Sequence, residues 1–447
     1  MGASKQTIHL ALVGGGMFGG DVVLRTIEDI ERCGLAPNLG RIGLDHRARE
    51  VAAVELKLVA IATRTPETAR KLVEGYRRRL PGSNPKPFSG ERPWEDAFRA
   101  SPRPDVLFVA TPDHLHTEPA LHAIERGAHL VVEKPLSLTL KEADTIERAA
   151  RAKGLVVGVD MHKRYDPCHR FIFEELLAKI GTPLYGRAVL EEPLELPTRT
   201  FRWAERSNPF SYVGVHWVDL FGHYLRLHPA SVHAVGQKDL LARWHLQADA
   251  PAGAKAIDAF DAMQVAVDYR EGPRIYYANS WINPKEFEGP VNQEMELVGT
   301  RGKIEFDQQY RGLRATFAGL GSRTFNPHFT ADVRRLPPHE GDSTLSAHAY
   351  DGYGKDSIVA IVDRAVRVIL GLATAEELAG TYPDAASSRS TVAVLEAADR
   401  VARRNLEHLR AGRGTPVTAR ISEEGIEIVD PTAPEPERIF SGNAYIA

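Results

Sequence analysis

The first 160 residues alternate short, almost wholly apolar runs with longer stretches in which apolar positions recur every three to four residues. The apolar runs are 8–13, 56–62, 106–110, 130–132 and 155–159. The periodic stretches, which predict amphipathic helices, are 22–31, 66–77, 118–126 and 140–152. Strands that are apolar throughout are typical of a parallel sheet covered by helices on both faces. We therefore expect an α/β domain with a doubly wound parallel sheet over 1–160, with 80–94, rich in Pro and Gly, as a connecting loop.

The pattern changes after Pro183 to longer β-rich runs separated by turns that contain glycine. These runs are 232–236, 262–269, 274–281, 294–298 and 303–306. Turns of this kind predict antiparallel neighbours. Two further helices are expected near 356–370 and 387–409. Residues 161–447 therefore predict a second domain, of the α+β class, with a mostly antiparallel sheet.

The first apolar run leads directly into a glycine-rich turn. Its residues are Gly14-Gly15-Gly16-Met17-Phe18-Gly19, which have the G-x-G-x-x-G spacing between a predicted strand and a predicted helix. In that context Gly14 permits a tight turn, Gly16 lets a pyrophosphate approach the backbone, and Gly19 lets helix and strand pack closely. The amides at the start of the helix, at Met17 and Phe18, would face the phosphates. The motif predicts a dinucleotide site; the alternative is a tight turn without a ligand.

The end of the second predicted strand bears on the choice of cofactor. An acid there typically binds the ribose 2′-hydroxyl of NAD, whereas an arginine suits the 2′-phosphate of NADP. Here the strand runs into Thr63 and Arg64, so NADP is favoured over NAD. Residues 33–53 form an insertion before this strand, and Asp45 within it is an alternative acid that does not close an apolar strand. The alternative for Arg64 is a solvated surface charge.

Titratable residues recur at helical spacing within 212–225. Tyr212, His216, Asp219 and His223 follow steps of four, three and four, so they share one face of a helix. The rest of the circumference is nearly all apolar, so most of this helix is expected to be buried. The polar stripe either lines a cleft or is the solvent side of the helix.

Composition narrows the class of partner. The 447 residues carry a formal net charge of −3, which gives no strong field to recruit nucleic acid or an anionic membrane. Cys33 and Cys168 lie far apart without a C-x-x-C spacing, so neither a structural zinc site nor a disulfide scaffold is expected. No apolar run approaches the roughly 20 residues of a membrane span. The expectation is a cytoplasmic protein without a metal that acts on a small molecule.

Several motifs together resemble the Gfo/Idh/MocA oxidoreductases, a family that includes glucose–fructose oxidoreductase and inositol dehydrogenases. Besides the glycine-rich turn, they are Ala110-Thr111-Pro112-Asp113-His114-Leu115-His116, Glu133-Lys134-Pro135, Arg164-Tyr165-Asp166-Pro167 and Gly214-Val215-His216-Trp217-Val218-Asp219. They occur in family order across roughly residues 7 to 306. The resemblance implies a Rossmann domain joined to a domain with a large open sheet. One face of that sheet would serve subunit contact, in a homodimer or homotetramer.

The resemblance also implies roles for individual residues. Lys134 and His216 would flank the nicotinamide and the substrate hydroxyl, with Asp219 as a partner of the substrate or of the histidine. Tyr212 stands where many members have an aspartate, which leaves the identity of the proton carrier open. Further cofactor contacts are expected from Thr63, Arg64, Thr111, Pro112, His114, His116, Glu133 and Lys134. Further substrate contacts are expected from Arg164 and Tyr165.

The activity implied is hydride transfer between nicotinamide C4 and a carbinol or carbonyl carbon of a sugar, sugar derivative or cyclitol. A base is needed because the alcohol proton leaves as the hydride departs, and Lys134 and His216 are the candidates. Two alternatives stay open. One is a glycosidase that retains NAD and acts by transient oxidation and elimination; the other is a non-enzymatic nucleotide-binding regulator. No motif encodes which sugar or cyclitol is bound.

Overall fold

The computed structural model describes residues 6–284, 286–287, 291–308, 314–317, 321–324, 328–334 and 348–440. The chain forms two compact units. The first comprises 1–136, 145–169 and 327–386, and the second comprises 137–144, 170–326 and 387–447. The division into a cofactor domain, 1–160, and a substrate domain, 161–447, stays a prediction. Within the described ranges, no helix is both long enough and apolar enough to cross a membrane.

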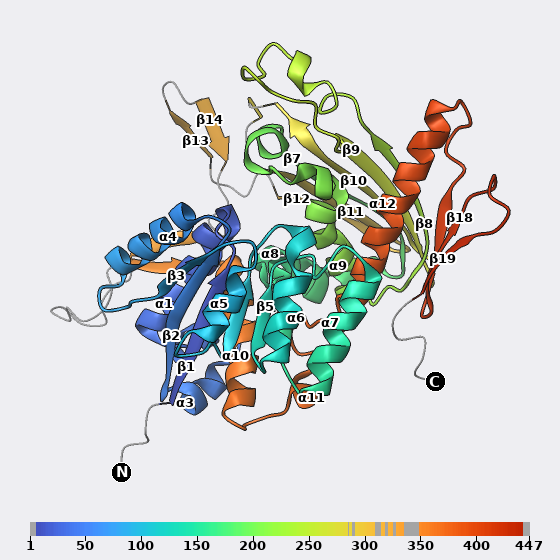
Figure 1. The fold of residues 1–447 in the computed structure, drawn as a ribbon. Coiled ribbons are helices and arrows are strands. Elements are labelled where there is room, and N and C mark those ends of the chain that lie inside the picture. Colours follow the sequence, from blue (N-terminus) through green and yellow to red (C-terminus); the bar gives the residue numbers. More distant parts are fainter. Residues whose placement is uncertain are drawn as a thin grey trace. The chain divides into compact units, whose positions relative to one another are not determined.

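The first unit is built on a six-stranded parallel sheet with the order β3-β2-β1-β4-β5-β6. Strands β1, β2, β3 and β5 of this sheet are labelled in Figure 1. Its strands are β1 (Gln6–Val13), β2 (Val54–Thr63), β3 (Lys86–Ser89), β4 (Val106–Val109), β5 (His129–Val132) and β6 (Val157–Val159). Every residue of β4, β5 and β6 is buried, as expected for strands with both faces covered. The predicted doubly wound sheet is confirmed.

Helices flank this sheet at nearly the positions that the apolar periodicity predicts. The main ones are α1 (Leu24–Cys33), α4 (Pro66–Arg79), α5 (Pro93–Arg99), α6 (Thr117–Glu125) and α7 (Leu140–Ala152). One π-helical turn, Gly19–Val23, precedes α1. The prediction of a loop over 80–94 was wrong at β3, which forms the edge of the sheet and pairs with β2. Edge strands tolerate proline, and with Phe88 as the only large apolar residue beside Pro87 the segment lacks the apolar signal of a strand.

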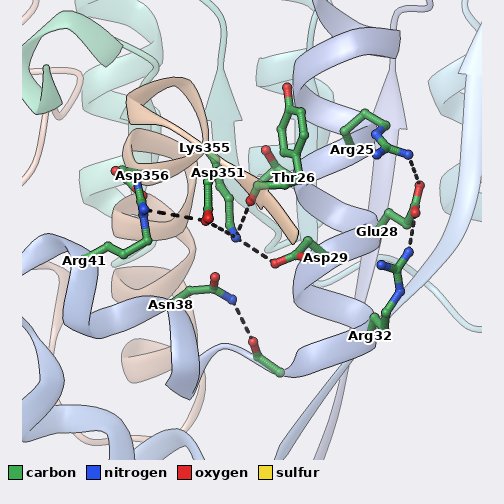
Figure 2. Close-up of polar contacts among 12 residues, drawn as sticks. Arg25, Thr26, Glu28, Asp29, Arg32, Asn38, Arg41, Asp351, Lys355 and Asp356 are labelled. Atoms are coloured by element: carbon green, nitrogen blue, oxygen red, sulfur yellow. Dashed lines mark hydrogen bonds and ion pairs between the residues drawn. The ribbon is translucent and has the colours of Figure 1, made fainter. Parts of the chain in front are cut away.

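The helix α10 (Tyr353–Ile369) belongs to the first unit, although its place in the sequence suggested the second domain. In Figure 1 it lies, in orange, among the blue and teal elements. Lys355 on α10 is fully buried, and its Nζ donates to Asp29 Oδ2 on α1 at 2.7 Å and to the Tyr350 carbonyl at 2.8 Å (Figure 2). A buried ammonium is stable only when paired in this way. This ion pair therefore fixes α10 against α1.

The insertion 33–53 is also tied to α10. It folds into short helical turns, α2 (Ala36–Leu39), η2 (Gly40–Ile42), η3 (Asp45–Arg47) and α3 (Ala48–Val51). Arg41 donates two hydrogen bonds, of 2.9 and 3.1 Å, to the carboxylate of Asp356 (Figure 2). Two further ion pairs join this insertion to α10, Arg47 to Asp363 and Glu50 to Arg367. The insertion is therefore an ordered part of the first unit.

The second unit contains a nine-stranded sheet with the order β12-β11-β7-β10-β9-β8-β17-β18-β19. Its strands are β7 (Pro183–Pro193), β8 (Pro229–Gln237), β9 (Ala262–Tyr269), β10 (Arg274–Asn283), β11 (Asn292–Gly299), β12 (Gly302–Asp307), β17 (Thr418–Ser422), β18 (Gly425–Val429) and β19 (Glu437–Phe440). Strands β7 and β10 pair in parallel, and the other neighbours pair antiparallel. The predicted mostly antiparallel sheet is confirmed. Two helices, α9 (Val215–Tyr224) and α12 (Arg389–Arg410), belong to this unit.

Four short strands lie outside the two large sheets. β13 (Arg314–Phe317) and β14 (Gly321–Thr324) form one antiparallel pair in the second unit. β15 (Ala331–Arg334) and β16 (His348–Asp351) form another in the first unit, and a short helix, α11 (Ala375–Leu378), follows α10.

Candidate functional site

The glycine-rich turn lies at the carboxyl end of β1. Gly14 has φ +105°, a conformation that L side chains rarely adopt, and a Cβ there would lie 2.1 Å from the Ala110 carbonyl oxygen. A Cβ on Gly19 would lie 3.1 Å from the Gly14 carbonyl oxygen. Glycine is therefore required at position 14, whereas a Cβ at position 19 would make a tight contact that its neighbours would have to relieve by a few tenths of an ångström.

Gly16 is in a different environment. A Cβ on Gly16 would meet no atom of the described residues within 4 Å, so the space above this residue is open. The helix begins at this point, because the Gly20 N–H donates to the Gly16 carbonyl at 2.9 Å. Backbone amides at a helix start with open space above them form a cradle suited to a phosphate group. The residues present, including Met17 and Phe18 in the first turn, fit the pyrophosphate of a dinucleotide.

The carboxyl end of β2 presents Thr63 and Arg64. Thr63 is buried and its Oγ1 donates to the Thr65 carbonyl at 2.9 Å, whereas Arg64 is exposed. Asp45 lies in η3, which leads through α3 to the first residue of β2 and so to the opposite end of that strand. At about 3.3 Å per residue, ten residues separate the two ends by roughly 30 Å. Asp45 is therefore remote from the place where a ribose would bind.

The loop after β4 carries Thr111, Pro112 and His114, all half-buried, and ends at His116, which is fully buried. Both ring nitrogens of His116 contact backbone carbonyls. Nδ1 lies 2.7 Å from the Pro135 oxygen, and Nε2 lies 2.9 Å from the Thr111 oxygen. His116 therefore joins this loop to the loop after β5, and its ring nitrogens are engaged by the chain itself.

A group of buried ionisable side chains lies at the carboxyl ends of β5 and β6. Glu133 and Lys134 follow β5 and are each 8% exposed, and Asp160 follows β6 with no exposed surface. Burial and the neighbouring Asp160 raise the pKa of Glu133 well above its usual value. The His162 Nδ1 lies 3.8 Å from Asp160 Oδ2, and burial lowers the pKa of His162. Proton exchange among buried groups is therefore possible beside Lys134.

Glu133 and Lys134 were expected at this place from the sequence, whereas Asp160 and His162 were not. The same sequence signal was available for Asp160 as for Glu133, because each residue directly follows an apolar strand. Arg164 and Tyr165 follow in the turn η5 (His162–Tyr165), with Arg164 buried and Tyr165 half-buried. Lys134 and the glycine-rich turn therefore belong to the same unit, and each follows a strand of its sheet. Arg164 and Tyr165, expected as substrate contacts, belong to this unit as well.

In the second unit, α9 carries three of the four stripe residues. His216 and Asp219 are only 5% and 2% exposed, whereas His223 is exposed. Tyr212 precedes α9 in the π-helical turn Phe210–Gly214 and is half-buried. Its ring packs edge-on against Phe201, with centroids 4.7 Å apart. A simple solvent-facing stripe is therefore wrong for His216 and Asp219, and His223 alone matches that description.

The start of α9 is held close to the sheet by one hydrogen bond and by a glycine that allows a close approach. The Trp217 indole Nε1 donates to the Val189 carbonyl of β7 at 3.0 Å. At Gly214, a Cβ would lie 2.5 Å from the Phe210 ring and 2.7 Å from Asn279 Oδ1 of β10. The absence of a side chain at Gly214 therefore lets the helix approach β10 closely and sets the position of His216.

Two family models match the chain. One is described as "Oxidoreductase family, NAD-binding Rossmann fold" and covers residues 8–161. The other is described as "GFO/IDH/MocA C-terminal domain" and covers residues 176–305. Together they span most of the chain and include the motifs described above except 164–167, which lies between the two matches.

Individual relatives extend this similarity. Levoglucosan dehydrogenase from Pseudarthrobacter phenanthrenivorans is 25% identical over 317 residues, which are 65% of this chain and 78% of that protein. The 1,5-anhydro-D-fructose reductase of Ensifer adhaerens is 38% identical over 87 residues, 19% of this chain and 26% of that protein. The chain spans less than half the length of the first curated relatives that it matches.

Solved structures share the fold. The inositol dehydrogenase homolog from Azotobacter vinelandii, complexed with NADH and myo-inositol, matches with a TM-score of 0.61 and 20% identity. The match covers 89% of this chain and 96% of that one. At this identity the similarity concerns the fold.

Proposed function

Because this chain belongs to the Gfo/Idh/MocA family of oxidoreductases with an NAD-binding Rossmann fold, we propose that it is an NAD(P)-dependent sugar or cyclitol dehydrogenase or reductase. The observation that carries the proposal is the open cradle at Gly16 in the same sheet unit as the buried Lys134. The names of the relatives support the substrate class, because they are dehydrogenases and reductases of anhydrosugars and inositols.

The glycine turn and the first-turn amides of Met17 and Phe18 would hold the pyrophosphate of the cofactor. A nicotinamide cofactor, when bound, supplies the hydride acceptor or donor. Arg64, exposed at the end of β2, would pair with a 2′-phosphate, which supports NADP over NAD. Thr63, Thr111, Pro112 and His114 would line the remainder of the cofactor site.

Oxidation of an alcohol releases a proton as well as a hydride, so a base must lie within hydrogen-bond reach of the hydroxyl. We assign this role to His216, because imidazole is the side chain that exchanges a proton near neutral pH. Lys134 would donate a hydrogen bond to the developing alkoxide and so stabilise its charge. Asp219 would orient His216 or bind a second hydroxyl, and Tyr212 would assist as a phenolic donor.

Turnover of a polyol panel tests the proposal. Purified protein is mixed with NADP or NAD and a set of cyclitols, aldoses and anhydrosugars, and reduced cofactor is followed by its absorbance. Lys134→Ala should lose most turnover but still bind cofactor, and Lys71→Ala, on the exposed face of α4, is the matched control. Wild-type rates in Lys134→Ala would refute the catalytic assignment.

The alternative activity is glycoside cleavage with a retained NAD. Its support is Tyr212, a phenol that precedes His216 by one turn and can act as acid or base. Stoichiometric NAD that survives purification, together with release of sugar from a nitrophenyl glycoside, would favour this activity over the dehydrogenase.

A further inference from the structure

One face of the helix that follows the glycine-rich turn is covered by residues from much later in the chain. These residues, 328–334 and 348–353, include β15, β16 and the first residue of α10, and we refer to them as the brace. Their contacts fall on Phe18, Asp21 and Arg25. Those three positions follow steps of three and four, which is the spacing of one helical face. The brace therefore lies along the first turns of the helix that begins at the phosphate cradle.

The first attachment of the brace is a hydrogen bond to the helix backbone. The buried Tyr350 of β16 donates from its hydroxyl to the Asp21 carbonyl at 2.7 Å. Burial raises the pKa of Tyr350, so the phenol keeps its proton and remains a donor. Arg25 adds an ion pair, in which its Nη2 lies 2.6 Å from Asp332 Oδ1. Because Asp332 is exposed, this ion pair contributes little, and the Tyr350 hydroxyl is the stronger attachment.

The second attachment is a ring cluster, which consists of Phe18, His162, Phe329 and Tyr353. His162 is nearly parallel to Phe18, with centroids 5.6 Å apart, and to Tyr353, with centroids 5.8 Å apart. Phe329 contacts the other three rings, at centroid distances between 5.2 and 6.2 Å. Aromatic rings at such separations attract one another beyond the burial of their surface. Phe18 is therefore packed against rings from the brace and from the turn after β6.

The start of α10 fixes the brace in turn. The Gly354 N–H donates to the Phe329 carbonyl at 3.0 Å. Gly352 has φ +127°, and a Cβ there would lie 2.2 Å from the Phe329 carbonyl oxygen, so the close approach of the two backbones requires glycine. The buried ion pair between α10 and α1 holds this helix in the unit. Phe329 is therefore attached to an element that is itself paired with the dinucleotide helix.

The cradle has little anchorage of its own. Gly16 has no side chain and Met17 is 52% exposed, so Phe18 is the first residue after Gly16 whose side chain packs. A backbone that contains glycine is conformationally free unless its neighbours restrain it. We propose that the ring cluster and the Tyr350 hydroxyl position the cofactor site, by keeping the first-turn amides oriented for a pyrophosphate before the cofactor binds. Such preorganisation raises affinity, because less order has to be created on binding. The effect on the cofactor rests on the proposed function, whereas the order imposed on the helix start does not.

Hydrogen exchange of the nucleotide-free protein tests the order of the helix start. Phe329→Leu removes one ring from the cluster and should speed exchange of the amides of 20–25 by about threefold to tenfold. Phe98→Leu is the matched control, because Phe98 is a buried ring of the same unit that packs edge-on against His122. Tyr350→Phe removes only the hydroxyl, should also speed this exchange, and decides the test if Phe329→Leu does not fold. Unchanged exchange over 20–25 in the folded variants would overturn the proposal.

Fluorescence titration with NADPH and NADH tests the effect on the cofactor. His162→Ala and Phe329→Leu should raise both dissociation constants by about threefold to tenfold, because the two cofactors share the pyrophosphate. His162→Phe, which keeps a ring in the cluster, should restore affinity to within about twofold of wild type, as should the control Phe98→Leu. Wild-type affinity in His162→Ala, or a loss confined to NADPH, would refute the positioning role. A wild-type protein that binds neither cofactor would refute the proposed function, and exchange over 20–25 would still decide whether the ring cluster orders the helix start.

Discussion

Gly14 approaches Ala110 so closely that a Cβ on residue 14 would lie 2.1 Å from the Ala110 carbonyl oxygen. Two residues later, a Cβ on Gly16 would meet nothing within 4 Å among the described atoms. One motif thus contains a glycine required by packing and a glycine required only if a ligand occupies the space. Substitutions at the two positions should therefore have different effects.

Gly14→Ala should destabilise the fold, and Gly16→Ala should not. The first change adds a steric clash and a strained backbone, which together cost roughly 2–5 kcal/mol. The second adds a methyl group to open space and should leave the melting temperature within about a degree. It should nevertheless raise the dissociation constant for NADPH or NADH at least tenfold, measured by fluorescence titration. Unchanged binding in Gly16→Ala would show that the cradle does not hold the cofactor.

Arg64→Ala should weaken NADPH far more than NADH. A guanidinium paired with a phosphate contributes about 1.5–3 kcal/mol, so the dissociation constant for NADPH should rise at least tenfold. That for NADH should stay within about twofold. Arg70→Ala, an exposed arginine on the neighbouring α4, is the matched control and should change neither constant. Equal losses for both cofactors in Arg64→Ala would contradict the proposed selectivity.

His216→Asn and His223→Asn compare two histidines of one helix. His216 is 5% exposed and His223 is exposed, although their spacing in the sequence places both on the polar stripe. If His216 is the base, its loss should lower kcat by about 10²–10⁴. Thermal unfolding should show that the variant remains folded. His223→Asn should retain full activity, and a similar loss in both variants would point to a general effect on α9.

His129 should make the protein less stable as pH falls. Its pKa in the folded state is lowered to about 4, whereas the unfolded chain takes up this proton near pH 6.5. The stabilisation is therefore complete above pH 6.5 and is lost between pH 6.5 and 4, by roughly 3 kcal/mol in total. His129→Asn keeps an oxygen that can accept the Val156 N–H but does not titrate. Urea unfolding at pH 7.5 and 4.5 should show a smaller loss for this variant, and an equal loss would exclude His129 as the source.

Much of the first sheet was predictable because its strands are apolar throughout and its turn needs glycine. β3 was not predictable, because the edge strand Lys86–Ser89 is only four residues long and contains proline. The position of α10 in the first unit was also not predictable from the sequence. Its Lys355 pairs with Asp29, which is far away along the chain, and local periodicity carries no information on such pairs.

The candidate site was predictable where a residue follows an apolar strand or belongs to a spaced motif, as for Lys134 and Gly16. The difference between His216 and His223 was not, because helical spacing is the same for both and only the packing of α9 in the folded chain buries the first.

The pair formed by Asp29 and Lys355 has a consequence for how the chain matures on the ribosome. The partner of Asp29 is added 326 positions after Asp29 itself. At roughly 5–20 residues per second, the carboxylate waits on the order of 15–65 seconds before its ammonium exists. During that interval the face of α1 that later receives α10 lacks this partner. The first sheet to be synthesised is therefore among the last parts of the molecule to be completed.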